Sequence, residues 1–334
     1  MLPTITHRLM MVAVIVIGTL AWMTVFARIQ PADGSDGISL MDARTAVWAA
    51  GLLLLIAGLP AMLGGLYVSA AGNPLSGVFT TGFCLMIFAG LGGSSEGLIF
   101  RHADWASSGG GSELFILLGI ELALWALAWG LMLLLIRRYR PRIRRRFVPR
   151  RFLTVYDRSD DRLTEEDTPR FVLHTLPMLA GLVCGGMGWL GCWYLIRTPS
   201  SGQVIGAILV SFTVASMTAR LIIPNGNVVY LVFSPLVAGL IAYGRMAIHH
   251  GGASSTDLIQ MLNVDAIHGP ALALPIHWAS AGMVGVATGI GMAQAIDRVR
   301  FADAQAKPDS PGITGSPGSL DSPGSLGSPG SDPQ

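Results

Sequence analysis

The chain has 334 residues, of which 51% are hydrophobic and only 13% are charged, and its mean hydropathy is +0.56. Ordinary soluble domains carry about 25% charged residues. This composition excludes a disordered protein and argues against a soluble enzyme. The net charge of +2 is too small to indicate nucleic-acid binding. The sequence is therefore typical of a protein embedded in a lipid bilayer.

Eight apolar stretches are long enough to cross a bilayer as helices, because a span needs about 20 mostly apolar residues. The sequence thus predicts an all-α, polytopic membrane helix bundle. Residues 1–27 also loosely fit a cleaved signal peptide, which would leave seven spans. The predicted spans are 9–27, 47–69, 78–100, 114–136, 171–196, 203–223, 228–248 and 271–295.

Four segments follow from this pattern. Residues 1–136 form a first four-helix membrane half, and residues 171–300 form a second. A charged loop, 137–170, joins them. The tail, 301–334, is rich in Pro, Gly and Ser and has almost no apolar side chains after residue 308, so we expect it to be disordered.

The basic residues predict the orientation, because cytoplasmic segments of membrane proteins carry an excess of Lys and Arg. Of the 22 Lys and Arg residues, 16 lie on the side of the 137–170 loop and four on the other side. The remaining two, Arg220 and Arg245, lie inside spans. We therefore expect both termini in the cytoplasm of a bacterial-type inner membrane.

A run of arginines begins the charged loop. Each cation close to an anionic membrane surface adds about 1 kcal/mol of binding, so these side chains are candidates for lipid-headgroup binding, and the alternative is a topology signal alone. The run belongs to no folded domain and lacks interleaved aromatic residues, so we expect no nucleic-acid partner. The candidates are Arg137, Arg138, Arg140, Arg144, Arg145 and Arg146.

Ionisable residues inside a span are costly and mark candidate functional sites. Glu121 lies about one third into the fourth span, and helical spacing places it on one face with Trp125 and Trp129. A carboxylate beside indole faces can bind a cation or carry a proton. The alternative is a protonated Glu121 that holds helices together. Glu96 and Arg245 lie near the outer ends of their spans, where they could form an outer mouth.

Proline and glycine residues point to breaks in several spans. Pro235 and Pro275 lie inside the seventh and eighth spans, and the third contains a Gly-rich run, 90–97. Broken helices often surround substrate sites in transporters. The spacing of Gly181 with Gly185, and of Gly285 with Gly289, predicts close helix packing instead.

Five histidines fall on the predicted outer side, together with several acidic residues. Imidazole and carboxylate groups suit zinc, copper or other divalent ions. No H-x-x-x-H or H-E-x-x-H spacing is present, so scattered loop histidines are the alternative to a metal site. The candidate ligands are His102, His249, His250, His268 and His277.

The sequence has no Walker P-loop, dinucleotide-binding motif or G-x-S-x-G motif, and it points to no particular cofactor. We do not expect an enzyme, although a membrane enzyme with an outer metal is a third alternative. The first hypothesis is a small-solute or ion transporter or channel, with a route between the broken helices of spans three, four, seven and eight. The second is a non-catalytic scaffold or sensor acting through the basic loop and the tail.

Overall fold

The computed structural model describes residues 2–30, 39, 47–93, 95–105, 112–148, 175–223, 228–250, 253–264, 267 and 269–306. Within these ranges every regular element is a helix and there is no strand, which confirms the all-α prediction. Eight of the described helices are long and apolar enough to cross a membrane. This number agrees with the sequence and suggests an integral, multi-pass membrane protein.

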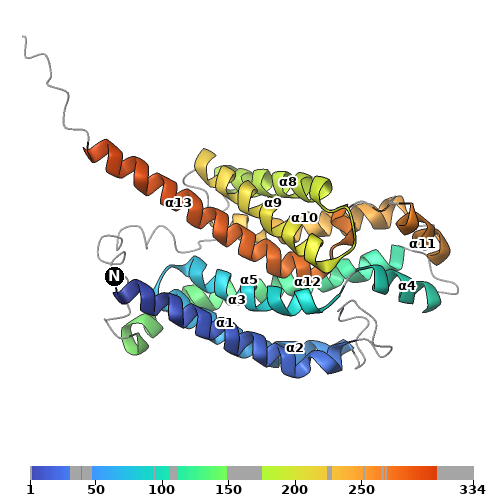
Figure 1. Ribbon diagram of the computed structural model, residues 1–334, viewed down its shortest axis with the longest axis horizontal. Coiled ribbons are helices and arrows are strands. Elements are labelled where there is room, and N and C mark those ends of the chain that lie inside the picture. Colours follow the sequence, from blue (N-terminus) through green and yellow to red (C-terminus); the bar gives the residue numbers. More distant parts are fainter. Residues whose placement is uncertain are drawn as a thin grey trace, which may run out of the picture. The chain divides into compact units, whose positions relative to one another are not determined.

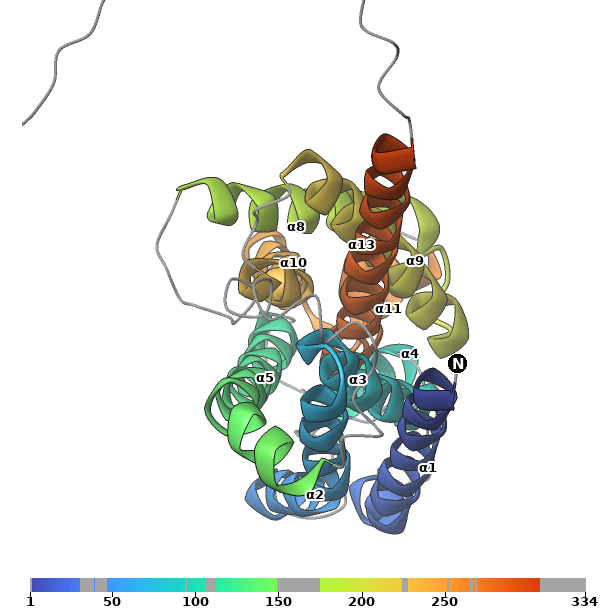
Figure 2. The same ribbon diagram turned by 90° about the vertical axis from the view of Figure 1, so that its left-hand side faces the viewer.

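Residues 2–295 form one compact unit. In it, α1, α2, α3 and α5 pack together on one side, and α8, α9 and α10 on the other (Figures 1 and 2). Helices α5 and α10 join the two groups, and the last span contacts α3, α9 and α10. The bounds are α1 (Leu2–Ile29), α2 (Val47–Ala71), α3 (Pro74–Leu91), α5 (Ser112–Phe147), α8 (Thr175–Leu195), α9 (Ser201–Ile222) and α10 (Val228–His249).

The surface of the helix groups carries many large apolar side chains. Leu127 is 71% exposed, and many other leucines on α1, α2, α5 and α8 face outward. Soluble monomers rarely expose contiguous apolar surface on this scale. The leucine-rich faces are therefore compatible with contact to lipid.

The third span ends earlier than the sequence predicted. Helix α3 stops at Leu91, Gly92 caps it, and Gly93 follows with φ of 78°, a conformation that favours glycine. A separate helix, α4 (Ser95–Trp105), then packs against α11 (Ser255–Asn263). The Gly-rich run therefore ends the span rather than interrupting it.

Helix α5 continues well beyond the predicted span. It reaches Phe147, so the first eleven residues of the predicted charged loop are helical. Arg140 explains part of this extension, because its guanidinium donates to the carbonyls of Ser69 and Gly72, both at 2.9 Å, at the C-terminal end of α2. Residues 149–174 of the predicted loop and residues 307–334 of the predicted disordered tail lie outside the described residues.

Among the spans that the structure describes, the last one has an irregular backbone. It begins with η3 (Gly269–Leu272) and α12 (Pro275–His277), passes through a π-helical segment, η4 (Trp278–Gly282), and ends in α13 (Met283–Ala306). By contrast α5 and α10 are continuous, even though α10 contains Pro235. The prediction of broken helices is therefore confirmed for the eighth span. It is wrong for the fourth and seventh spans, which are continuous helices.

Close backbone contact at glycine holds the last span against α9. A Cβ atom built on Gly289 would lie 2.2 Å from the Thr213 carbonyl oxygen and 2.1 Å from the Ser216 hydroxyl. Gly285 similarly approaches the Leu209 carbonyl, and Gly181 approaches Tyr230 across the α8–α10 contact. These positions confirm the close packing predicted from the glycine spacing.

We expect Gly289→Ala to destabilise the protein by about 2 kcal/mol, because overpacking a tight contact costs about 1–3 kcal/mol. Gly291→Ala is the matched control, since a Cβ there meets nothing within 4 Å. The control should unfold at the same temperature or slightly higher, by the better helix propensity of Ala. Thermal unfolding in detergent measures both, and equal midpoints would contradict the packing interpretation.

Candidate functional site

Glu121 is buried where the two helix groups meet. Its side chain is 2% exposed, and Glu121 is the only Asp, Glu, Lys or Arg residue within the apolar stretch 114–136 of α5. The Ser39 hydroxyl, from the segment between α1 and α2, donates to the Glu121 carboxylate at 2.6 Å. The carboxylate is also near enough to interact electrostatically with the Tyr243 hydroxyl of α10. An acidic group inside the bundle is thus hydrogen-bonded to one other segment and interacts electrostatically with a second.

Tyr243 links this carboxylate to the last span. Its hydroxyl donates to the carbonyl of Ala273, which directly follows η3. One turn before it on α10, Gly239 lets the Trp278 ring pack closely, since a Cβ there would lie 2.9 Å from that ring. Trp278 itself is fully buried. The polar centre is therefore built from α5, α10 and the start of the last span.

The π-helical segment is held by an indole of α5. Trp129 Nε1 donates to the Ala279 carbonyl at 2.9 Å, inside the stretch where the regular helical ladder is altered. The neighbouring His277 is fully buried, and its Nδ1 accepts from the Leu274 N–H at 3.1 Å. Because Nδ1 accepts, the neutral ring carries its proton on Nε2, which is buried and has no hydrogen-bond partner among the described residues. π-Helical turns occur frequently at functional sites.

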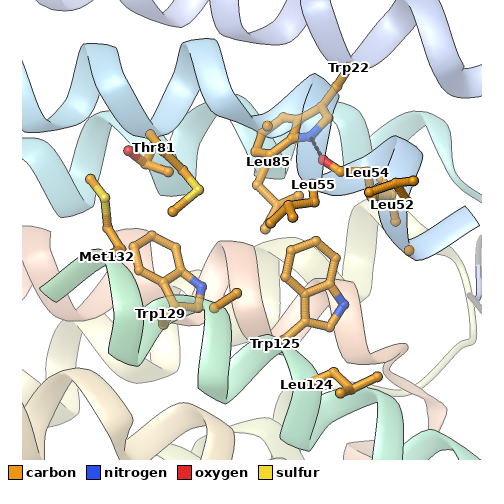
Figure 3. A pocket seen from close by; sticks show the side chains of 14 residues that line it. Trp22, Leu52, Leu54, Leu55, Thr81, Leu85, Leu124, Trp125, Trp129 and Met132 are labelled. Carbon is orange, nitrogen blue, oxygen red and sulfur yellow. Dashed lines mark hydrogen bonds between the residues drawn. The ribbon is translucent and has the colours of Figure 1, made fainter. Parts of the chain in front are cut away.

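Trp125 faces a different space from Glu121. It lines an apolar cavity of about 430 Å³ together with Trp129, Trp22 and side chains of α2 and α3, and Glu121 does not line this cavity. Figure 3 shows the Trp125 and Trp129 rings projecting from α5 toward Trp22 and Leu85. The predicted grouping of the carboxylate with two indoles is thus divided between a polar centre and an apolar cavity.

Glu96 and Arg245 lie apart from the polar centre. Glu96, on α4, is exposed and borders a small cavity with Pro199 and residues of α11 and η3. The Arg245 guanidinium stacks over the Trp193 ring, 5.1 Å from its centroid. The structure gives these two side chains different surroundings, and their predicted role at an outer mouth remains a prediction.

The candidate metal ligands are only partly described. His249 and His250 border an open pocket with Asp257, whose carboxylate caps α11 by accepting from the Ser254 N–H and hydroxyl, both at 2.8 Å. The Ser254 hydroxyl and N–H lower the pKa of Asp257. No group of three or more His, Cys, Asp or Glu side chains is suitably placed among the residues described. His277 is buried elsewhere, and the His102 side chain and His268 lie outside the described part.

The candidate lipid-binding arginines divide into two kinds. Arg137, Arg138, Arg145 and Arg146 are exposed on the extension of α5, and Arg144 is half-buried. Arg140 is buried and donates to α2, as described above. The exposed arginines are thus free to meet a membrane surface, whereas Arg140 joins two helices.

Sequence reasoning missed Ser39, Tyr243 and Trp278. Ser39 carries no local signal, because only the tertiary fold brings it to Glu121. Tyr243 did carry one, since Pro235, Gly239 and Tyr243 follow one another at four-residue spacing on one face of an apolar helix. A polar group on such a face of small residues indicates a contact with another helix.

No known protein family, characterised protein or solved structure matches this chain. Function must therefore be argued from the chain's own residues.

We expect Trp129→Phe to lower stability by about 1 kcal/mol, because the buried Ala279 carbonyl loses its donor. Trp125→Phe is the matched control: it makes the same change in size, four residues earlier on the same helix, and its Nε1 has no described hydrogen-bond partner to lose. Both variants are compared by thermal unfolding in detergent. An equal loss in both would show that ring size, and not the hydrogen bond, is what matters.

Proposed function

We propose that this protein carries a proton or a small cation across the membrane, and that Glu121 is the group that binds it. The observation that carries the proposal is the burial of the Glu121 carboxylate at the junction of the two helix groups. A bundle held only by packing gains little from a buried acid, which is costly within a membrane and is a functional candidate by default.

The surroundings of Glu121 support this role. The Ser39 hydroxyl oxygen lies 2.6 Å from the carboxylate, and Tyr243 is close enough to interact with it electrostatically. Oxygen atoms are the ligands that hard cations prefer. The irregular start of the last span lies next to them and exposes backbone dipoles that a continuous helix would not. The proposed route therefore passes beside η3 and η4, and not through breaks in α5 or α10.

The orientation belongs to the same proposal. Both termini and the basic extension of α5 face the cytoplasm of a bacterial-type inner membrane, as the distribution of Lys and Arg supports. Glu121 then lies in the outer half of its span, and an ion reaches it first from the outer side.

We expect Glu121→Gln to abolish cation flux while leaving folding intact, because Gln keeps the size of the side chain and its amide oxygen can still accept from Ser39. The purified protein is placed in liposomes that contain a pH-sensitive dye, and a potassium gradient with valinomycin sets the voltage. Proton entry is measured first, and then flux of lithium and sodium.

The matched control is Glu113→Gln, which changes an exposed carboxylate two turns earlier on α5. It should conduct like the wild type. Flux that survives in Glu121→Gln, or wild-type liposomes that are no faster than protein-free ones for all three cations, would contradict the proposal. Thermal unfolding against a panel of ions and solutes can then identify a co-substrate, since a ligand at 100 times its Kd stabilises by about 2.7 kcal/mol.

A second candidate function is a scaffold or sensor that meets anionic lipid through the α5 extension. The exposed positions of Arg137, Arg138, Arg145 and Arg146 favour it. Each such cation contributes about 1 kcal/mol at an anionic surface.

We expect replacement of these four arginines by Gln to weaken binding to anionic lipid without lowering stability. Arg140→Gln should leave lipid binding unchanged and lower the free energy of unfolding by about 1–3 kcal/mol. The reason is that the carbonyls of Ser69 and Gly72 lose a buried charged donor. Thermal unfolding with and without phosphatidylglycerol measures both effects. A lipid response that survives in the fourfold variant would exclude these side chains as the binding surface.

A further inference from the structure

The cavity beside Trp125 is enclosed by helices of the first group. Its volume is about 430 Å³, which falls in the range of about 300–1,000 Å³ for small-molecule pockets. Its deep wall is formed by side chains that are about 1% exposed, Leu85 of α3 and Met132 of α5. Figure 3 shows these side chains around the space with the indoles of Trp22, Trp125 and Trp129.

The cavity opens sideways between α2 and α5. Leu52 and Leu55 of α2 and Leu124 of α5 line it and are also 46–50% exposed on the outer surface. Both helices are apolar over their full spans at this level. The opening is therefore continuous with the leucine-rich face that is compatible with lipid.

The lining offers no free polar group to a ligand. Trp22 Nε1 donates to the Leu54 carbonyl, Trp129 Nε1 to Ala279, and the Thr81 hydroxyl to Ala61. The Trp125 Nε1 atom has no hydrogen-bond partner among the described residues, but it is buried by protein atoms and is not exposed to the cavity. A polar or charged solute would lose its hydration here without compensation, so the cavity selects hydrocarbon.

The depth of the cavity identifies the source of that hydrocarbon. Trp125 is the central residue of the apolar stretch 114–136 of α5, so the cavity lies near the middle of the span. Lipid acyl tails occupy that level of a bilayer, whereas headgroups lie about 15 Å or more away. Close-packed proteins do not leave apolar voids of this size unfilled without a loss of packing contacts.

We propose that this cavity is a binding site for the acyl tail of a membrane phospholipid, which enters between α2 and α5 while its headgroup stays at the membrane surface. The site is separate from Glu121. The bound tail lies against Trp129, the residue that holds the π-helical segment.

The test uses nanodiscs that contain phosphatidylcholine with a photoactivatable diazirine near the end of one acyl chain. After illumination, mass spectrometry locates the labelled residues. We expect label on Leu85 and Met132, which outer lipid cannot reach, as well as on the lipid-facing Leu127. Wild-type protein labelled at Leu127 but not at the two deep residues would overturn the proposal.

Two glycine variants separate the cavity from the general surface. Gly51 lines the cavity, and a Cβ atom there meets nothing within 4 Å. The leucine side chain of Gly51→Leu should therefore fill the opening, and its Cβ atom clashes with no neighbour. Gly186→Leu is the matched control, on α8, where a Cβ also meets open space. Gly51→Leu should reduce the deep label several-fold and leave label at Leu127 unchanged. Gly186→Leu should change neither.

Deep label that is unaffected in Gly51→Leu would overturn the site, with Gly51→Ala as a milder variant if the larger one unfolds. Deep label from a free diazirine hydrocarbon but not from phosphatidylcholine would also overturn it, in favour of a free apolar solute. Labelling needs no ion gradient and should persist in Glu121→Gln, so the lipid site and the proposed cation flux can fail independently.

Discussion

The bundle depends on close approach of helix backbones, because helices with apolar outer faces gain little by hiding apolar surface from one another in lipid. Glycine supplies this approach where it matters most. Gly289 places the last span against α9, and Gly239 places Trp278 against α10. Dispersion contacts and a few hydrogen bonds to backbone carbonyls then stabilise the bundle, whereas the hydrophobic effect stabilises the core of a soluble protein.

The same constraint explains where polar side chains are found. Trp129 donates to the Ala279 carbonyl where the last span changes its helical register, and Arg140 donates to the carbonyls at the end of α2. Arg140 satisfies carbonyls at a helix end, and Trp129 supplies a donor to a carbonyl in the irregular segment. Glu121 differs from them, because it is an acidic side chain, and it accepts from the Ser39 hydroxyl. That difference is why the proposed function centres on the carboxylate.

The polar centre and the apolar cavity share one helix. Glu121 interacts with Tyr243 of α10, whereas Trp125 and Trp129 line the cavity with side chains of α1, α2 and α3. Trp129 also reaches the last span through its Nε1. Helical spacing correctly placed the three residues near one another along α5. One face of a long helix can nevertheless pack against two different helices. Which neighbour each side chain meets is a property of the packed bundle.

The sequence by itself determined the helical class, the number of apolar spans and the position of Glu121 within one of them, because hydropathy, chain length and charge are local quantities. It also indicated the glycine contacts, since their spacing repeats along one helix face. Only the tertiary structure decided that Ser39 contacts Glu121, that Trp278 is buried, that Tyr243 bonds to the start of the last span, and that the last span alone among the described spans contains a π-helical segment. These features depend on contacts between residues distant in the chain, which no local pattern encodes.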